Sequence, residues 1–283
     1  MTPSSKPESD FPWWLVILAV TGLWLLWEML SDDVYRAALT TLGQGVWITV
    51  GVSVFAYLGA CLIGLGLAVM GLSRDVGLRP IGPVYIQGMR GVPILVLLLY
   101  VAFVLVPGLV QAVNWVSGSL LGGEDVLRAR DVPLLWRAVL ALMLAYSAFL
   151  AEIFRAGLQA VDKGQVEAAM ALGLNGWQRF RHIVFPQAFR MILPPLGNDF
   201  VAMVKDSSLV AVLGIGDVAQ LAKVTAAGNF RYFETYNVAA LIYLVMTIGL
   251  SLLLRRFEAG RRGRGGGGGE GGCPRRGLRP RPP

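Results

Sequence analysis

Charged side chains are scarce in this chain of 283 residues: Asp, Glu, Lys and Arg make up 15% of it, against about 25% in an ordinary soluble domain. Two cysteines are too few for a disulfide framework, and the single histidine leaves no metal-ligand spacing. Hydrophobic side chains reach 55%, with a mean hydropathy of +0.60. The composition therefore argues against a soluble enzyme and favours a membrane protein.

The surplus of positive charge is confined to the C-terminal end. The net charge is +7, and the nine arginines from Arg255 onward, against two glutamates, account for all of it. Residues 1–254 hold 16 basic and 16 acidic side chains and are neutral overall. The basic character therefore says little about partners of the folded body, and we expect no nucleic-acid partner.

Six uncharged or nearly uncharged stretches are long enough to cross a bilayer, which takes about 20 apolar residues. They are Trp13–Leu30, Val46–Leu72, Gly91–Gly123, Pro133–Glu152, Met191–Gly216 and Thr235–Leu254. We expect Pro107 to break the third stretch, while the fifth contains charged residues. The sequence predicts an all-α polytopic membrane protein with about six transmembrane helices.

Lys and Arg are distributed unevenly between the loops on the two sides of these spans. Alternate loops carry 18 on the side of both termini and six on the other side, or nine against six without the tail. Positive residues are enriched in cytoplasmic loops. Both termini are therefore predicted to lie in the cytoplasm.

The tail from Gly260 onward, GRRGRGGGGGEGGCPRRGLRPRPP, has no hydrophobic periodicity and is predicted to be disordered. Its glycine run is followed by neither Lys-Ser nor Lys-Thr, so it is not a phosphate-binding loop. The arginines could attract anionic lipids, or the tail could be an incidental extension; the sequence leaves both open.

Gln165–Pro186 is an unusually long loop between the fourth and fifth spans, on the predicted cytoplasmic side. Val166–Leu172 is predicted to be a short Ala-rich helix that ends at Gly173, since glycine tolerates the left-handed conformation of a helix C-terminus. A second amphipathic stretch follows, which we expect Pro186 to stop. Its apolar face is expected to hold Trp177, Phe180, Ile183 and Val184. Aromatic side chains beside small alanines are typical of a protein docking surface.

The residues Glu167-Ala168-Ala169, Gly173, Ile183 and Phe185-Pro186 stand in this loop in an order that resembles the EAA motif of binding-protein-dependent ABC importer permeases. The family usually has Leu where this chain has Phe185. Four further stretches resemble its polar amino acid permeases: Arg90–Val96, Ser147–Arg155, Leu193–Phe200 and Lys205–Leu209. The likeness runs from about Leu42 to Phe257 and departs at Leu97, where the family commonly has Gln.

The resemblance implies a five-helix permease core with a cytoplasmic coupling-helix loop, preceded here by one extra N-terminal helix. We divide the chain into an extension at 1–41, a permease domain at 42–258 and a tail at 259–283. The implied partners, in a bacterial inner membrane, are ATP-binding cassette subunits, a second permease copy or paralogue, and an extracytoplasmic amino-acid-binding protein. The chain itself is then not an enzyme and has no cofactor, because ATP and magnesium bind to the partner ATPase.

The resemblance places the coupling to the ATPase in the long loop. The residues expected to carry it are Glu167, Ala168, Ala169, Gly173, Ile183 and Pro186. Small residues let a helix seat in a groove, and the Glu167 carboxylate can meet a basic group of the partner. A short helix rooted in two spans can pass on a movement of the ATPase as a rigid body.

Polar side chains inside the fifth span are candidates for a substrate pathway. Asn198 and Lys205 are seven residues apart, as are Asp199 and Asp206, which places each pair on one line of a helix. An ionisable group at mid-bilayer is unfavourable by about 2.5 to 3.5 kcal/mol on insertion scales, so it is usually paired or faces water. Either these four polar side chains face the path of a zwitterionic amino acid, or they form a buried network that holds the spans together.

Glu152, at the inner end of the fourth span, is a further candidate for the pathway. It lies three residues before Arg155, so the alternative is an ion pair between the two side chains. A structural pair of this kind would leave Glu152 outside the pathway.

Two other function classes compete with an importer subunit. A stand-alone secondary carrier or channel for a small polar solute usually shows repeated halves, and none is visible. A membrane-embedded enzyme needs a nucleophile with a base or a metal cluster in its spans, whereas the one histidine, His182, lies in a loop. The sequence does not identify which amino acid is transported.

Overall fold

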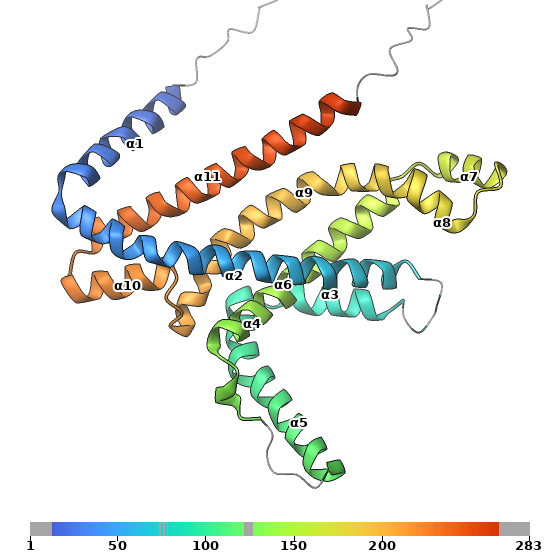
Figure 1. Ribbon diagram of the computed structural model, residues 1–283, viewed down its shortest axis with the longest axis horizontal. Helices are drawn as coiled ribbons and strands as arrows, with labels where there is room; N and C mark the ends of the chain where they lie inside the picture. Colours follow the sequence, from blue (N-terminus) through green and yellow to red (C-terminus); the bar gives the residue numbers. More distant parts are fainter. Residues whose placement is uncertain (1–12, 74, 76, 78, 122–126, 266–283) are drawn as a thin grey trace, which may run out of the picture.

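The computed structural model describes residues 13–73, 75, 77, 79–121 and 127–265, and within this part the chain forms helices and no strand. The first helix, α1 (Trp13–Ser31), leads into α2 (Asp33–Gly71). The Asp32 side chain caps α2 by accepting from the Val34 N–H at 2.8 Å. Figure 1 shows that α1 stands away from the bundle while α2 runs along its length.

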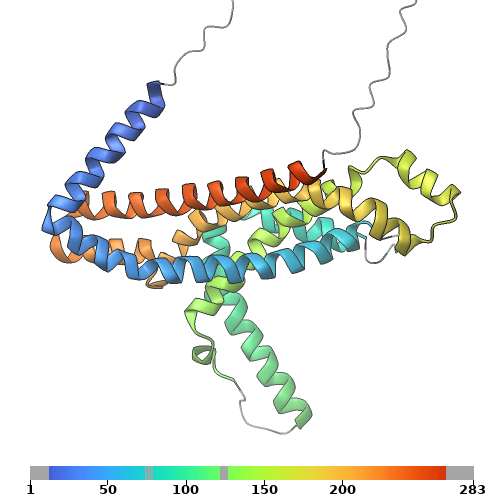
Figure 2. The ribbon, with the colours of Figure 1, turned by 45° about the horizontal axis from the view of Figure 1, so that its top comes forward.

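The middle of the chain turns sideways out of the bundle. After α3 (Ile81–Gly91), which lies beside α2 and α6, one continuous helix comprises α4 (Ile94–Tyr100), the π-helical turn η1 (Val101–Leu105) and α5 (Val106–Leu121). Figures 1 and 2 both show α5 projecting away from the other helices. A 3-10 turn, η2 (Ala129–Asp131), then precedes α6 (Leu134–Gln159), which returns through the bundle.

The second half of the chain builds one projecting end and closes the bundle. It comprises α7 (Lys163–Ala171), α8 (Gly176–Arg179), the π-helical turn η3 (Phe180–Val184), α9 (Phe185–Asp206), the 3-10 segment η4 (Ser207–Leu213), α10 (Val218–Asn229) and α11 (Tyr232–Gly265). Figure 1 shows α7 and α8 at one end of the bundle, with α10 and the start of α11 at the opposite end.

Four helical segments of the described part are long and apolar enough to cross a membrane: Asp33–Gly71, Ile94–Ser119, Leu134–Gln159 and Tyr232–Arg256. The segments Gly176–Leu213 and Val218–Asn229, bent by 49° to each other, make a fifth if they count as one span. These five overlap the second to sixth predicted spans. The all-α polytopic fold is confirmed, whereas the count of six is not, because α1 is not among these segments.

The main core lies where α2 packs against α6, and small residues bring the two helices together. Ala56 and Ala60 of α2 and Ala148 and Ala151 of α6 are buried. A Cβ on Gly64 of α2 would stand only 2.9 Å from the Ser147 carbonyl oxygen of α6. In a membrane, where burial of apolar surface gives helix pairs no advantage over lipid, such close backbone approach stabilises the pair through van der Waals contacts.

Two π-helical turns carry the helices past prolines. The expected break at Pro107 and the expected stop at Pro186 are both wrong, because helix continues through both residues. Proline lacks an N–H and crowds the carbonyl four residues earlier; the wider π turn before each proline moves that carbonyl aside. α9 also continues through Pro194 and Pro195.

Candidate functional site

The loop between α6 and α9 contains a short helix with defined ends. α7 begins at Lys163, three residues before the predicted start, because the Asp162 side chain caps it by accepting from the Gln165 N–H at 3.2 Å. Its last residue is Ala171. A helix of nine residues with a capped start is a compact unit that can project from the bundle (Figure 1).

Gly173 ends this helix as the sequence predicts. Its φ is +77°, in the left-handed region, and its N–H donates to the Met170 carbonyl at 2.9 Å. The Leu174 N–H donates to the Ala169 carbonyl at 3.1 Å. This pair of bonds is a Schellman motif, which satisfies the last carbonyls of a helix and favours glycine at this position.

The expected coupling residues do not all face outward. Glu167, Ala168 and Gly173 are exposed, and nothing lies within 4 Å of a Cβ built on Gly173. Ala169 is 1% exposed, so its expected place in the docking surface needs correction. With period 3.6, Ala169 falls on the side of α7 that faces its own chain, and it holds the helix in position.

Ile183 and Pro186 lie in the continuous helix that runs from α8 to α9. Ile183 is half-buried within the π turn, and Pro186 is exposed in the first turn of α9. The structure therefore places Pro186 on a helix surface, beside the loop but not at a helix end. His182 makes a contact of 2.9 Å from Nδ1 to the Gln178 carbonyl oxygen, within the same segment.

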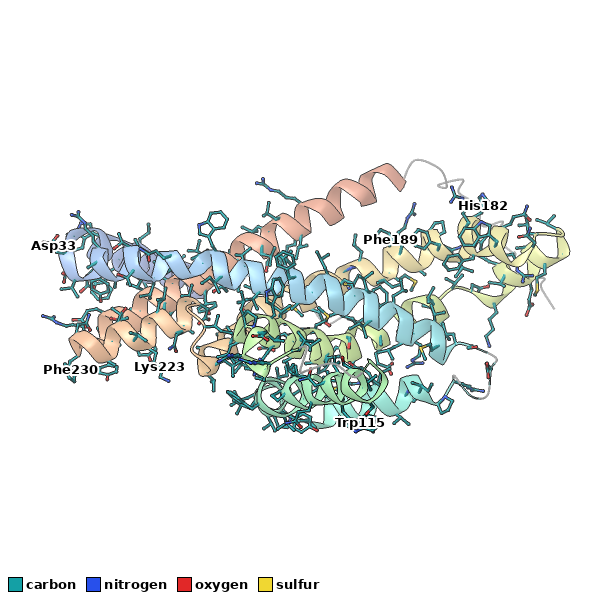
Figure 3. All side chains as sticks on the ribbon, turned by 60° about the horizontal axis from the view of Figure 1, so that its bottom comes forward. Asp33, Trp115, His182, Phe189, Lys223 and Phe230 are labelled. Carbon is teal, nitrogen blue, oxygen red and sulfur yellow. The ribbon has the colours of Figure 1, made fainter. Side chains whose placement is uncertain are left out.

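A ladder of aromatic rings replaces the apolar face expected for this segment. The rings of Trp177 and Phe180 are 5.9 Å apart, those of Phe180 and Phe185 5.8 Å, and those of Phe185 and Phe189 5.6 Å. The extra residue of the π turn rotates Phe185 into line, so Ile183 and Val184 turn inward and are half-buried. Figure 3 shows Phe189 and His182 near this end, opposite Asp33 and Phe230.

The polar residues of the fifth span lie on α9, where they divide into two rows. Asn198 and Lys205 are exposed, whereas Asp199 and Asp206 are half-buried. The Tyr146 hydroxyl of α6 donates to the Asp206 carboxylate at 2.7 Å. One row is therefore accessible, and the other joins α9 to α6 as the network alternative expects.

Lys205 forms no ion pair with any acidic residue in the described part of the chain. Within the described residues the ion pairs join Arg36 to Asp33, Arg155 to Glu152 and Arg231 to Glu234. Lys205 therefore has no carboxylate within the 4.0 Å of an ion pair in the part of the chain described. An exposed ammonium on an apolar helix of this kind can take a carboxylate from outside the chain.

Glu152 is engaged with Arg155, as the alternative for this pair predicts. Nη2 of Arg155 lies 2.5 Å from Oε2 of Glu152, and Nε donates to the same oxygen at 3.0 Å. Glu152 also lines a cavity of about 420 Å³ between α6 and α9, together with Ile153, Ala156, Gly157, Ala160, Met191 and Pro195. None of Asn198, Lys205 and Asp206 lines that cavity, so the structure does not bring the four pathway candidates together.

A family model described as "binding-protein-dependent transport system inner membrane component" matches residues 60–263, which include α7 and α9. The chain belongs to this family. The permease is 36% identical to the probable amino-acid permease protein YxeN of Bacillus subtilis (strain 168) over 232 residues, which cover 82% of this chain and 94% of that relative.

Further likenesses come from another relative and from a solved structure. The permease is 34% identical to the glutamine transport system permease protein GlnP of Escherichia coli (strain K12) over 224 residues, 78% of this chain and 93% of that relative. The crystal structure of an amino acid ABC transporter with histidines has a TM-score of 0.68 and 36% identity, and covers 82% of this chain and 98% of that chain.

Family membership confirms the role that the resemblance implies. The permease is a multi-pass protein of the bacterial inner membrane and the translocation subunit of an ABC importer. The family depends on a binding protein, and its relatives are transport permeases and not enzymes. ATPase and binding-protein partners follow from this membership at the level of the family.

Proposed function

We propose that the permease imports a polar amino acid and that two partner ATP-binding cassette subunits, which bind the ATP and magnesium, power the transport. The named relatives support this substrate class, since one is a glutamine transport protein and one was crystallised with histidines. The observation that carries the proposal is Lys205, an exposed ammonium on an apolar helix with no carboxylate of the described residues in ion-pair range. An amino acid brings the carboxylate that this ammonium lacks.

The two rows on α9 have different parts in this proposal. Lys205, with Asn198 on the same line of the helix, faces the path and meets the substrate carboxylate. Asp206 is held by the Tyr146 hydroxyl, so its position is set before the substrate arrives. Asp206 and the half-buried Asp199 supply negative charge for the substrate ammonium. Glu152, held by Arg155, serves as a structural residue at the end of the span.

The α7 loop makes the contact with the ATPase in the same proposal. The exposed carboxylate of Glu167 and the small surfaces of Ala168 and Gly173 form the docking surface. Ala169, Ile183 and Pro186 support it from within the chain and from the first turn of α9. The Schellman motif and the Asp162 cap make the loop stiff, which is what transmission of a rigid-body movement requires.

The membrane orientation in this proposal places the α7 end in the cytoplasm. The end of α2, the start of α3, the α7 loop and the C-terminal part of α11 all lie at this end in Figure 1. Most of the arginines counted for the cytoplasmic side belong to the sequences of the α7 loop, of α11 and of the stretch that joins α2 to α3. The beginning of α6 with η2, and the turn between α10 and α11, then face the extracytoplasmic binding protein. A second permease subunit, identical or paralogous, completes the path.

The experiment compares Lys205→Ala with Lys223→Ala, a matched exposed lysine on α10 (Figure 3). Complexes with ATPase and binding protein are reconstituted in proteoliposomes, and uptake of radiolabelled glutamine, histidine and arginine is measured. We expect Lys205→Ala to lower uptake about tenfold while the complex still assembles, since a hydrogen bond to a charged group contributes about 1.5 to 3 kcal/mol. Normal uptake in this variant, or loss of assembly, would overturn the assignment.

A further inference from the structure

Arg137 is a buried charged side chain that the transport pathway and the coupling loop do not use. It lies in the first turn of α6 and is 7% exposed. Within the described residues it has no acidic partner within ion-pair distance. Its guanidinium instead donates to three backbone carbonyls: Nη1 to Ala102 at 2.7 Å, Nε to Val132 at 3.0 Å, and Nη2 to Ala129.

The Ala102 carbonyl needs this donor because of Pro107. In an α-helix the carbonyl would accept from the N–H of Val106, and in a π-helix from that of residue 107. The Val106 N–H donates to the Val101 carbonyl, and Pro107 has no N–H. Ala102 is fully buried, so no water can replace the missing donor. Arg137 therefore supplies the hydrogen bond that the proline removes.

The other two carbonyls belong to the turn outside the membrane helix. Ala129 begins the 3-10 turn η2, and Val132 follows its last residue. A single guanidinium thus ties η2 to the π turn η1 across the start of α6. Figures 1 and 2 both show the α4–α5 helix and the beginning of α6 side by side at this place, and η1 contacts α6 directly.

The helix that contains the π turn packs on the segment that follows the polar end of α9, because α4 contacts η4 directly. Val101 and Ala102 are fully buried in the main core, together with Val210 and Leu213 of η4. η4 begins at Ser207, directly after Lys205 and Asp206. A contiguous set of packed elements therefore runs from η2 through Arg137, η1, α4 and η4 to the polar row that we assign to the pathway.

We propose that Arg137 is a positioning residue for transport, which clamps the η2 turn onto the π turn and passes a displacement of η2 to η4 and the polar end of α9. The clamp replaces the hydrogen bond donor that Pro107 removes and adds a link that an ordinary helical bond would not make. Its transport role rests on the proposed function, in which the binding protein docks at the η2 end.

The clamp itself is tested on the purified chain in detergent, without any transport. Arg137→Met, which keeps much of the side-chain length and removes every donor, should lower Tm by about 3 °C or more. Pro107→Ala restores an N–H at residue 107. In the Pro107→Ala background, Arg137→Met should therefore lower Tm by less than about half of what it does in the unaltered chain. Pro194→Ala, which removes a helix-interior proline of α9, serves as the control and should leave the loss unchanged. If Arg137→Met lowered Tm equally in the unaltered, Pro107→Ala and Pro194→Ala chains, the clamp would be overturned.

The transport role is tested with the double variant Pro107→Ala/Arg137→Met in proteoliposomes with ATPase and binding protein. This variant should assemble and keep the basal ATPase rate, because the buried carbonyl again has a donor. Stimulation by the binding protein and uptake of labelled glutamine, histidine or arginine should still fall about tenfold, because η2 is no longer tied to η1. Stimulation equal to that of the unaltered complex would overturn the positioning role. Failure of the unaltered complex to respond to a binding protein would overturn the proposed function and leave the detergent result standing.

Discussion

The two ends of α6 each hold an arginine, and the two arginines are stabilised in opposite ways. Arg155, near α7, pairs with Glu152, and the two side chains are 40% and 34% exposed. Arg137, near η2, is buried and bonds to three backbone carbonyls. Where water reaches a charge, a carboxylate three residues away is a sufficient partner. Where water does not, the partners are backbone carbonyls, and Pro107 has left one of them, that of Ala102, without a backbone donor.

The largest expected effect comes from reversing these two charges. Arg137→Glu places a carboxylate against three carbonyl oxygens in a dry site, so the chain should fail to yield a monodisperse membrane protein; an unpaired buried charge is unfavourable by about 3 to 5 kcal/mol. Arg155→Glu should still give a folded chain, with a loss of about 1 kcal/mol or less, since exposed pairs contribute little. Size-exclusion profiles and thermal unfolding measure both variants. Equal yields of the two variants would show that the burial of Arg137 does not make it more sensitive to charge reversal than Arg155.

A substitution at Gly173 asks whether the exposed end near α7 is a docking surface. Gly173→Asp adds a second negative charge, besides that of Glu167, to a surface that loses its water on docking, so we expect normal membrane levels and uptake reduced about tenfold or more. Gly173→Asn is the matched control, because asparagine tolerates the left-handed conformation and brings no charge. Co-purification of the ATPase with the tagged chain measures the contact. Full ATPase binding by the aspartate variant would contradict the docking role.

Between the two ends of α6, variants of the hydrogen bond from Tyr146 to Asp206 test whether Asp206 contributes to stability or to transport. Tyr146→Phe removes a hydrogen bond between α6 and α9, and bonds of this kind in membranes contribute about 0.6 to 1.7 kcal/mol, so stability should fall slightly. Asp206→Asn can still accept from the hydroxyl but has lost the charge, so uptake should fall with little change in thermal stability. Thermal unfolding and uptake are measured side by side. If Asp206→Asn loses stability and not uptake, Asp206 belongs to a structural network alone.

The smallest effect is expected for Glu152→Gln at the exposed end. The neutral amide can still accept from Arg155, and water solvates the guanidinium, so the free energy of unfolding should change by less than about 1 kcal/mol. Uptake should stay within about twofold, because we assign no substrate contact to Glu152. Loss of uptake with normal assembly would return this residue to the pathway.

Much of the structure around α7 and the end of α6 could be predicted from rules that involve only neighbouring residues. The end of α7 at Gly173 follows from the left-handed preference of glycine, and the pair of Glu152 and Arg155 follows from helix spacing. The EAA-like order of residues made the family predictable as well. These features depend on neighbours within a few residues, which a sequence displays directly.

The π turns explain several features of the structure that could not be predicted from the sequence. A single inserted residue keeps the helix intact at Pro107 and Pro186 and brings Phe185 into the aromatic ladder, so spacing counted at 3.6 residues per turn fails beyond it. The burial of Ala169 depends on how α7 packs on its own chain. Arg137 carried a signal in Pro107, a proline in an apolar span, but its partner carbonyl lies 35 residues away in the chain.

The most direct measurement is uptake by proteoliposomes that contain the permease with its ATPase partner, with a binding protein outside and ATP inside. Labelled glutamine, histidine and arginine are supplied in turn, and ATP or the binding protein is left out in parallel samples. An ATP-driven importer subunit takes up at least one of these amino acids only when both ATP and the binding protein are present. Uptake that the permease achieves alone, driven by an ion gradient and unaffected by either omission, would contradict it.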